Sequence, residues 1–366
     1  MNILFLTTHA NTGGITSYIL TLGEGLVSSG HHVWVVSSGG DAVPRMEALG
    51  MRHVRLNIRT KSEVHPKLWL SLGALKDLTW KNEINIIHSQ TRVTQVLGHA
   101  LSRLTGIPMV TTCHGFFRPR WFRKAFPCWG KGVIAISKPV VRHLSEDFHV
   151  PQDRIHWIVN GVDLKRFAPA DDVQRRLVRQ EWKIAGNTPL IGIIARLSDV
   201  KGIDVLIRAM PRVLKEMPGA RLMIVGQGPE EAHLKKLAVD LSLSGEVFFR
   251  NTINQTNRIL PAFDVFAMPS LMEGLGLSVM EAQACGVPVV ASAVGGLVDL
   301  IEDGQSGFLV PSRDESVLAD RLITLLKNPG QGMAMAERAR LNIQEHFSAD
   351  IMVQKTLQVY EQYSRR

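Results

Sequence analysis

The chain has 366 residues, of which 45% are apolar and 20% are charged. This length predicts two domains, each with its own hydrophobic core, and ordinary Gly and Pro contents exclude collagen-like and low-complexity chains. No apolar run reaches the roughly 18–20 residues of a membrane-spanning helix. We expect no signal peptide, because the sequence opens directly with a strand-like run. The three cysteines lie too far apart for a zinc site and fit a reducing, cytoplasmic compartment.

The formal net charge of +9 is carried by the first half of the chain. Residues 1–168 contain 20 Lys and Arg against 10 Asp and Glu, whereas residues 169–366 contain 22 against 23. A basic half favours an anionic partner: a membrane surface, a nucleic acid or a phosphorylated substrate. The alternative, that the charge serves only solubility, stays open at this point.

Short β-rich runs alternate with amphipathic stretches along the first half. The runs contain four to six apolar residues, a pattern typical of strands buried on both faces of a parallel sheet. Strands are predicted over Ile3–Thr7, Val33–Ser37, Ile84–His88, Met109–Thr112, Val133–Ser137 and Ile155–Val159, and helices over Thr16–Ser29, Thr94–Leu104 and Pro139–Phe148.

The alternation lapses into charge around Asp163–Arg179, which we interpret as a linker, and then resumes. The whole pattern predicts an α/β protein with two doubly wound, Rossmann-like domains in tandem and a ligand site in the central cleft that they face. Strands are predicted over Leu190–Ala195, Arg221–Val225, Val247–Arg250, Val265–Met268, Val287–Ala291 and Phe308–Val310, and helices over Ile203–Met217, Glu230–Leu241 and Leu277–Ala284.

The predicted domains are residues 1–168 and residues 169–347. The last helical segment, within about residues 348–366, lies beyond a complete second domain. We expect it to pack back on the first domain.

Two glycine loops each follow a strand and open a helix. Gly13–Gly14 could face a phosphate or a sugar, because backbone amides at a helix start attract anions; it could equally be a tight turn. Gly226 and Gly228, in the run Gly-Gln-Gly-Pro, favour the structural interpretation, because Pro229 presets the helix geometry.

Two cations lie near the mouth of the second predicted sheet. Arg196 ends a buried strand, and Lys201 follows five residues later, before Gly202. Together they could neutralise a diphosphate and stabilise charge that grows on a leaving group. The alternative is a solvated loop pair.

The segment 269–292 carries two carboxylates, Glu273 and Glu281, eight residues apart. If the helix begins near Leu277, Glu273 lies in the loop before it and Glu281 lies about one turn inside. The amides that follow Glu273 would point at a bound anion. A carboxylate within so apolar a helix has little reason to be there without a partner. His114 also ends a predicted strand, in the first domain. Its neighbours Gly115, Phe116 and Phe117 favour a position in a cleft; the alternative is a structural histidine.

These features together resemble the large family-four, group 1 set of retaining GT-B glycosyltransferases, which are cytosolic enzymes that use nucleotide sugars. The resemblance covers nearly the whole chain and is most specific from Arg196 to Gly296. It rests on Gly13–Gly14, His114–Gly115, Ser137–Lys138, Asn160–Gly161–Val162–Asp163, Phe167, Arg196, Lys201–Gly202, Gly226–Pro229, the Glu273 and Glu281 pair, and Gly295–Gly296.

The resemblance implies a role for each matched residue. Arg196 and Lys201 would hold the donor diphosphate in place of a metal ion. No cofactor is expected, because the nucleotide sugar is a substrate. Glu281 would bind the ribose. Glu273 and His114 would contact the donor sugar, which makes His114, Arg196, Lys201 and Glu273 the expected catalytic groups. Gly14 would face the phosphate, the amides of Gly274, Leu275, Gly276 and Leu277 would support sugar and phosphate, and the base would lie near Gly226, Gly228, Arg250 and Asn251.

The implied reaction moves a sugar with retention from a UDP- or GDP-sugar to a glycan or lipid-linked acceptor, for an envelope polysaccharide or lipopolysaccharide. Five aromatic and four basic residues lie within residues 116–127, followed by Trp129 and Lys131. Such a mixture suits a lipid–water interface. We therefore expect the segment Phe116–Lys131 to dock on the anionic inner face of the cytoplasmic membrane; the alternative is a folded loop with its aromatic residues in a core.

Two other functions remain open. A nucleic-acid-binding protein could use the basic half, although no helix-turn-helix, zinc or RNA-recognition signature is present and we expect no nucleic acid. A GT-B-fold nucleotide-sugar epimerase is the second, although that family lacks the Glu273–Glu281 segment as written here.

Overall fold

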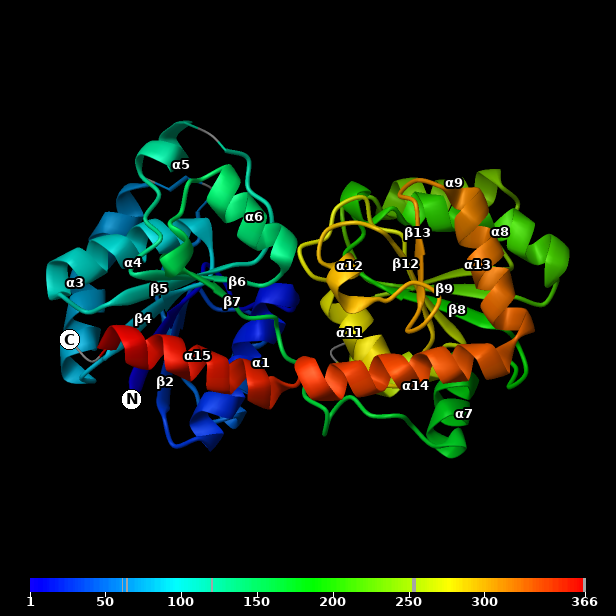
Figure 1. The fold of residues 1–366 in the computed structure, drawn as a ribbon, viewed down its shortest axis with the longest axis horizontal. Helices are drawn as coiled ribbons and strands as arrows, with labels where there is room; N and C mark the ends of the chain where they lie inside the picture. The colour runs from blue at the N-terminus through cyan, green and yellow to red at the C-terminus, as the bar shows by residue number, and fades with distance from the viewer. Residues whose placement is uncertain (61, 64, 120, 252–254, 365–366) are drawn as a thin grey trace. The chain divides into compact units, whose positions relative to one another are not determined.

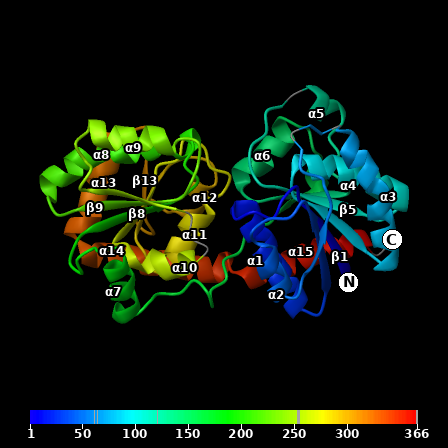
Figure 2. The same cartoon turned by 180° about the vertical axis from the view of Figure 1, so that it is seen from behind.

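A computed structural model describes residues 1–60, 62–63, 65–119, 121–251 and 255–364, without the side chain of Phe122. The chain divides into two compact units (Figures 1 and 2). Unit 1 consists of Met1–Gly161 and Ala349–Arg366, and unit 2 of Val162–Ser348. Unit 2 is therefore an insertion into the sequence of unit 1.

In the described residues, unit 1 is built on a seven-stranded parallel sheet of order β3-β2-β1-β4-β5-β6-β7. The strands are β1 (Asn2–Leu6), β2 (His32–Ser37), β3 (Arg52–Arg55), β4 (Ile86–Ser89), β5 (Met109–Cys113), β6 (Gly132–Ala135) and β7 (Ile155–Trp157). The helices are α1 (Gly14–Ser28), α2 (Val43–Ala48), α3 (Pro66–Lys81), α4 (Arg92–Thr105), α5 (Trp121–Ala125), α6 (Lys138–Glu146) and α15 (Ala349–Ser364), with a 3₁₀ turn over Gln152–Arg154.

Alternating apolar residues of β1 serve two cores. Ile3 and Phe5 face α1, α2 and α15, whereas Leu4 and Leu6 face α3 and α4. All four are fully buried, which explains why the strand reads as a continuous apolar run.

In the described part of unit 2, the parallel sheet has six strands in the order β10-β9-β8-β11-β12-β13. The strands are β8 (Leu190–Ile194), β9 (Arg221–Val225), β10 (Val247–Arg250), β11 (Val265–Met268), β12 (Val289–Ser292) and β13 (Phe308–Val310). The helices are α7 (Asp172–Glu181), α8 (Ile203–Glu216), α9 (Glu231–Asp240), α10 (Thr256–Ile259), α11 (Leu277–Ala284), α12 (Leu297–Leu300), α13 (Glu315–Lys327) and α14 (Pro329–His346), with 3₁₀ turns over Asp199–Lys201 and Leu260–Ala262.

The predicted linker is wrong from residue 172 onward, because α7 occupies residues 172–181. The side chain of Asp171 caps this helix by accepting the backbone N–H of Gln174 at 2.7 Å. Arg179 is 2% exposed, pairs with Asp264 at 2.7 Å and donates to the carbonyl oxygen of Ala262 at 3.0 Å. A buried cation thus anchors the helix. Because the helix is mostly polar, it lacks the apolar periodicity that identifies most helices in a sequence.

The two units meet in the sequence earlier than the predicted boundary after residue 168. The backbone N–H of Val162 donates to the carbonyl oxygen of Phe347 at 2.9 Å, so the chain joins unit 2 directly after Gly161. The last helix, α15, belongs to unit 1 and lies along α1 (Figures 1 and 2). Val353 and Tyr360 of α15 are buried in the core that contains Ile3 and Phe5.

Candidate functional site

The strand order of unit 2 reverses between β8 and β11, which are neighbours in the sheet. In doubly wound sheets, ligands bind beyond the carboxyl ends of the strands at such a reversal. The loop after β8 carries Arg196 and Lys201, and the loop after β11 carries Glu273. Three of the four expected catalytic groups therefore flank one topological switch point.

Lys201 and Glu273 meet at this point. Lys201 Nζ lies 2.5 Å from Glu273 Oε2, and Ser270 Oγ donates to the same oxygen at 3.3 Å. The two charged side chains are 21% and 13% exposed, so the pair is shielded without being sealed from water. A cation held in place at a reversal of the sheet is suited to binding an anionic group without further rearrangement.

The backbone locks the two loops together. Leu271 N–H donates to the carbonyl oxygen of Val200 at 2.8 Å. Gly202 adopts a φ of 60°, and a Cβ there would lie 2.1 Å from the carbonyl oxygen of Pro269. Only glycine fits this close approach, so the backbone of the Lys201–Gly202 turn is held against the loop after β11.

Arg196 lies two residues beyond the end of β8 and is exposed. Among the described residues, its side chain has no hydrogen-bond or ion-pair partner. The next residue, Leu197, is 1% exposed in the core and anchors the loop. The guanidinium group of Arg196 is therefore available to a ligand, although the structure does not bring it into contact with Lys201.

Helix α11 begins at Leu277, as predicted, after Gly276. Glu273 accordingly precedes the helix and Glu281 lies one turn inside it. Thr256 Oγ1 of α10 donates to Glu281 Oε2 at 3.5 Å. Glu281 is part-buried, and this hydrogen bond joins it to a threonine rather than to Lys201 or Glu273.

The loops after β9 and β10 join at a backbone hydrogen bond from Gly226 N–H to the carbonyl oxygen of Arg250, at 2.9 Å. A Cβ at Gly228 would lie 2.0 Å from the carbonyl oxygen of Leu197, so this glycine is required by packing against the Arg196 loop. Arg250 and Asn251 are exposed beside it. Gly226 and Gly228 thus have a structural role, whatever else binds there.

In unit 1, the loop after β1 leads to Gly14, the first residue of α1. A Cβ placed on Gly14 would meet nothing within 4 Å, so local packing does not require glycine at this position. The open space is compatible with the phosphate-facing role that the sequence predicts.

His114 directly follows β5 and is part-buried. Its Nε2 lies 2.9 Å from Gln90 Oε1, and the ring of Tyr18 meets it edge-on at 4.8 Å between centroids. Burial lowers the pKa of His114 to about 3, so the imidazole is neutral at physiological pH.

Sequence reasoning missed several residues that hold these groups. Ser270 lies within the segment that drew attention to Glu273, so proximity could have identified it. Gln90 and Tyr18 gave no signal, because their contacts to His114 join residues far apart in the chain.

Comparison with known proteins decides the family. The model of glycosyl transferases group 1 matches residues 174–342, and that of glycosyltransferase family 4 matches residues 12–166. A D-inositol 3-phosphate glycosyltransferase of Salinispora arenicola is 30% identical over 393 residues, covering 96% of this chain and 87% of that protein. This chain belongs to the group 1 glycosyltransferases.

Two further similarities describe this group 1 glycosyltransferase. It is 36% identical over 213 residues to a GDP-mannose-dependent monoacylated alpha-(1-6)-phosphatidylinositol monomannoside mannosyltransferase of Corynebacterium glutamicum, a match that spans 56% of each chain. The Anabaena protein Alr3699/HepE, solved in complex with UDP and glucose, superposes with a TM-score of 0.88 at 21% identity, covering 99% of this chain and 100% of that one. The predicted GT-B fold is thereby confirmed.

The described residues contain no group of three or more His, Cys, Asp or Glu side chains arranged to hold a metal ion. Within the same residues, no helix combines the length and apolar character needed to cross a bilayer.

Proposed function

We propose that this glycosyltransferase moves a sugar with retention from a UDP- or GDP-sugar to a glycan or lipid-linked acceptor of the cell envelope. The observation that carries the proposal is the Lys201–Glu273 ion pair at the reversal of the unit 2 sheet. The relatives support the donor class, since one is named as GDP-mannose-dependent and another was solved with UDP and glucose.

The proposed chemistry follows from the charges at this point. The bond between the anomeric carbon and the diphosphate oxygen breaks, and the nucleoside diphosphate leaves with the electron pair. Lys201 and Arg196 offset the charge that develops on it, in place of a metal ion. The acceptor oxygen attacks from the same face, and its proton passes to the leaving phosphate oxygen. This front-face route with retention is the mechanism that the resemblance to the family implies.

The remaining predicted residues complete the proposed donor site. Glu273 would bind sugar hydroxyls with its second carboxylate oxygen, and Glu281 would accept from the ribose. His114 would contact the sugar from unit 1, and the open space at Gly14 would admit a phosphate. The backbone amides of residues 274–277 precede or begin α11, where the helix dipole favours an anion.

A thermal-shift screen against UDP, GDP and their sugars tests the donor, because a ligand at about 100 times its Kd adds about 2.7 kcal/mol of stability. Lys201→Ala should abolish the shift and lower kcat/KM by about 100-fold or more. Lys327→Ala is the matched control, since it breaks an exposed ion pair with Glu216 at 2.6 Å in the same unit. Near-normal turnover by Lys201→Ala, or a shift with nucleic acid alone, would contradict the proposal. Undiminished turnover in EDTA is expected.

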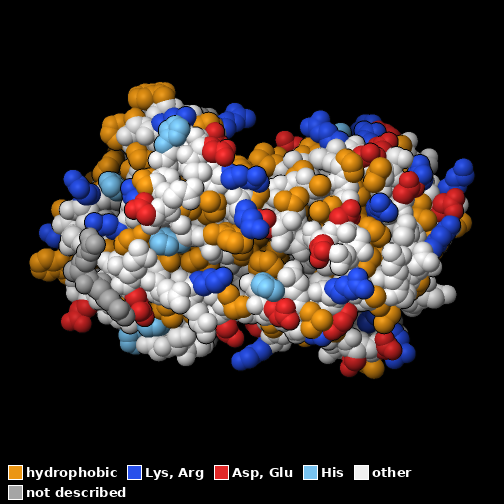
Figure 3. Space-filling model, in the orientation of Figure 1, with side chains coloured by type: hydrophobic (Ala, Val, Ile, Leu, Met, Phe, Trp, Pro, Cys, Tyr) orange, Lys and Arg blue, Asp and Glu red, His pale blue; other side chains and the backbone are white. Residues whose placement is uncertain are grey.

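We also propose that unit 1 docks on an anionic membrane surface. Within the predicted segment, Trp121 and Phe126 are 77% and 57% exposed, and hydrophobic side chains gather over α5 in Figure 3. Arg118 and Lys124 are exposed beside them. Arg120 and the side chain of Phe122 lie outside the described residues. Each cation near an anionic leaflet contributes about 1 kcal/mol.

The other aromatic side chains that the structure describes in this segment pack against neighbouring groups of unit 1. Phe116 meets the ring of His143 at 5.4 Å, Phe117 lies under Arg123, and Trp129 is 6% exposed. Among the aromatic side chains that the structure describes, the expectation of a lipid-facing segment therefore applies to Trp121 and Phe126. Helix α3 of unit 1, which no sequence pattern indicated, also exposes apolar side chains near cations in the sequence: Trp69, Leu70 and Trp80 among Lys67, Lys76 and Lys81.

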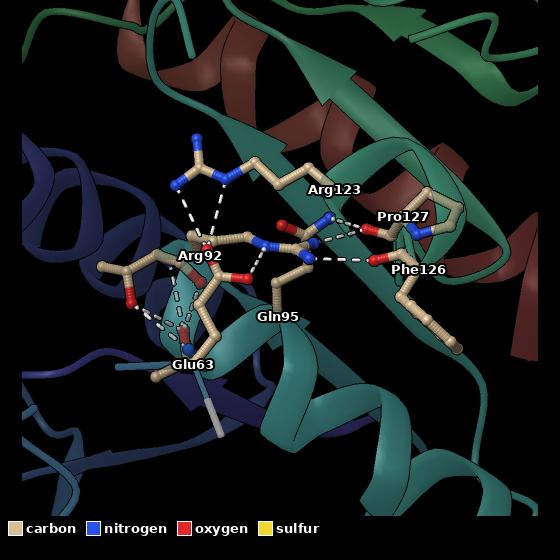
Figure 4. A network of polar contacts seen from close by, with 8 residues as sticks. Glu63, Arg92, Gln95, Arg123, Phe126 and Pro127 are labelled. Carbon is tan, nitrogen blue, oxygen red and sulfur yellow. Dashed lines mark hydrogen bonds and ion pairs between the residues drawn. The ribbon is translucent and has the colours of Figure 1, made fainter. Parts of the chain in front are cut away.

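A polar network holds α5 in this position (Figure 4). Arg92, 7% exposed, donates to the carbonyl oxygens of Phe126 at 2.8 Å and Pro127 at 2.7 Å. Glu63 binds Arg92 at 2.9 Å and Arg123 at 3.2 Å. The backbone around α5 is therefore fixed while Trp121 and Phe126 face outward, which leaves their apolar area free to insert into a membrane interface.

Sedimentation with phosphatidylserine vesicles at low salt tests the docking surface. The wild type should bind them, and the Trp121→Ser, Phe126→Ser double variant should lose binding. Val239→Ser is the control, because Val239 is 63% exposed on α9 of unit 2. A wild type that ignores anionic vesicles would overturn this proposal and leave the donor proposal intact.

A further inference from the structure

His114 is held on two sides by side chains of unit 1. Gln90 follows β4 and is 2% exposed, and its amide oxygen lies 2.9 Å from His114 Nε2. Tyr18 of α1 is 2% exposed, and its ring packs edge-on against the imidazole at an interplanar angle of 78°. These two contacts fix the plane of the His114 ring.

The contact with Gln90 also fixes the proton. In the structure the amide oxygen of Gln90 faces His114 Nε2, and the amide nitrogen of Gln90 is buried without a hydrogen-bond partner among the described residues. An amide oxygen only accepts hydrogen bonds, so in this orientation His114 Nε2 carries the hydrogen and donates it. In a neutral imidazole the other nitrogen, Nδ1, then has a lone pair and no hydrogen. His114 can therefore accept a hydrogen bond from a ligand at Nδ1, but it cannot donate one there.

Tyr18 is itself anchored. Its hydroxyl lies 3.1 Å from Thr112 Oγ1, and Thr112 Oγ1 lies 2.7 Å from Nε2 of the fully buried His88. The three groups lie in a core where a misplaced polar atom is costly, so the position of Tyr18 is well defined. The edge of its ring in turn limits rotation of His114.

We infer that Gln90 is a positioning residue that holds His114 as the Nε2–H tautomer, so that Nδ1 accepts a hydrogen bond from a hydroxyl of the donor sugar. This inference rests on the proposed contact between His114 and the donor. Two consequences follow from it: His114 is neither a proton donor nor a cation toward the sugar, and the sugar must present a hydroxyl hydrogen at that point. Burial, which keeps the imidazole neutral, is consistent with both.

The tautomer is tested by ¹⁵N NMR of the full chain labelled at histidine, with His114→Asn to assign the signals. The wild type should show a protonated Nε2 and a bare Nδ1 for His114, unchanged between pH 6 and pH 9. Gln90→Leu, which removes the acceptor, should give a mixture of tautomers, and Gln90→Glu should restore the Nε2–H form at pH 8. Tyr18→Phe keeps the ring against His114 and should leave the tautomer unchanged. A wild-type Nδ1–H signal overturns the inference, even if the Gln90 variants fail to fold.

Kinetics test the consequence for the substrate. Gln90→Leu should lower kcat/KM by about 10-fold, equal to one hydrogen bond, with recovery in Gln90→Glu. Donors in which each sugar hydroxyl is replaced by hydrogen or by fluorine should reveal one position where both replacements cost about 10-fold, and this cost should vanish in His114→Ala. A fluorinated donor that keeps full activity at that position would show that His114 donates, and would overturn the inference. If no position couples to His114 while NMR shows Nε2–H, the donor contact fails and the tautomer stands.

Discussion

The hydroxyl of Tyr360 lies 2.6 Å from Nδ1 of His88, although 272 residues separate them in the sequence. Both side chains are fully buried. His88 uses its second nitrogen to bind Thr112 at 2.7 Å, so both ring nitrogens are satisfied in the core of unit 1. Helix α15 is thus attached by a specific hydrogen bond in addition to its apolar contacts.

Tyr360→Phe should destabilise unit 1 by about 1–3 kcal/mol, because it leaves His88 Nδ1 buried without a partner. Urea unfolding followed by the fluorescence of the tryptophans measures the change. Tyr363→Phe is the control, since its hydroxyl makes a less buried contact with His156 Nε2 at 3.0 Å. If both variants change the free energy of unfolding by the same small amount, the hydrogen bond from Tyr360 to His88 does not stabilise unit 1 more than an ordinary surface contact does.

Stability should fall on acidification because His88 is buried. Burial lowers its pKa to about 3 in the folded protein, against 6.5 for an ordinary histidine. Below pH 6.5 the imidazole of His88 is protonated in the unfolded chain but stays neutral in the folded chain. The free energy of unfolding therefore falls by about 1.4 kcal/mol per pH unit between pH 6.5 and pH 3. Above pH 6.5, His88 is neutral in both states and this loss of stability is absent.

The measurement compares urea unfolding at pH 7 and pH 5 for the wild type and His88→Gln. The variant should lose less stability than the wild type over this interval. His233→Gln, at a residue on α9 of unit 2, should behave as the wild type does. A His88→Gln variant with an unchanged pH dependence would show that His88 takes up its proton in the folded state.

The ion pair at the sheet reversal predicts coupling between its members. Glu273→Gln keeps the shape of the side chain but releases Lys201 Nζ, so kcat/KM should fall by about 10-fold or more with little change in Tm. In the double variant with Lys201→Ala, the loss should be smaller than the product of the two single losses. Independent, multiplicative losses would mean that Glu273 does not act on Lys201.

Arg92 should protect the chain around α5 from proteolysis. Arg92→Leu removes the donors to Phe126 and Pro127, so trypsin cleavage after Arg123 and Lys124 should accelerate. Mass spectrometry of timed digests measures the rate. Arg103→Leu, an exposed arginine of the same helix, should leave cleavage at α5 unchanged. Equal acceleration at sites throughout unit 1 would instead indicate global destabilisation.

Gln283→Met should be tolerated. Gln283 is fully buried on α11, and its Oε1 has no partner within the described residues; its Nε2 makes one long contact to the carbonyl oxygen of Leu300 at 3.4 Å. Replacement by methionine should change the free energy of unfolding by less than about 1 kcal/mol. Gln283→Glu should cost several times more, because it buries a carboxyl group. Thermal unfolding of both variants tests this contrast.

The sequence predicts the two sheets well because their central strands are apolar on both faces. Strand β3, with the sequence RHVR, was missed because it is polar, and it lies at the edge of the sheet. Helix α7 was missed for the related reason that its fixed point is the buried Arg179 rather than a row of apolar side chains. Local pattern therefore identifies elements that bury apolar surface, and fails where polar residues do the anchoring.

The candidate site shows the same limit. The motifs after β8 and β11 predicted Lys201 and Glu273, because glycine spacing and strand ends are local features. The partners of His114 could not be predicted, since Gln90 reaches it across the sheet rather than along the chain. Which nitrogen of a histidine carries the proton depends on such a neighbour, so this property is invisible to motif analysis.

The insertion of unit 2 into unit 1 dictates an order of events during translation. Domains fold as their residues emerge from the ribosome, but α15 is made only after Val162–Ser348 is complete. Until then, the nascent unit 1 lacks the apolar contacts of α15 and the hydrogen bond from Tyr360 to His88. A chaperone that shields apolar grooves would find its target in this interval.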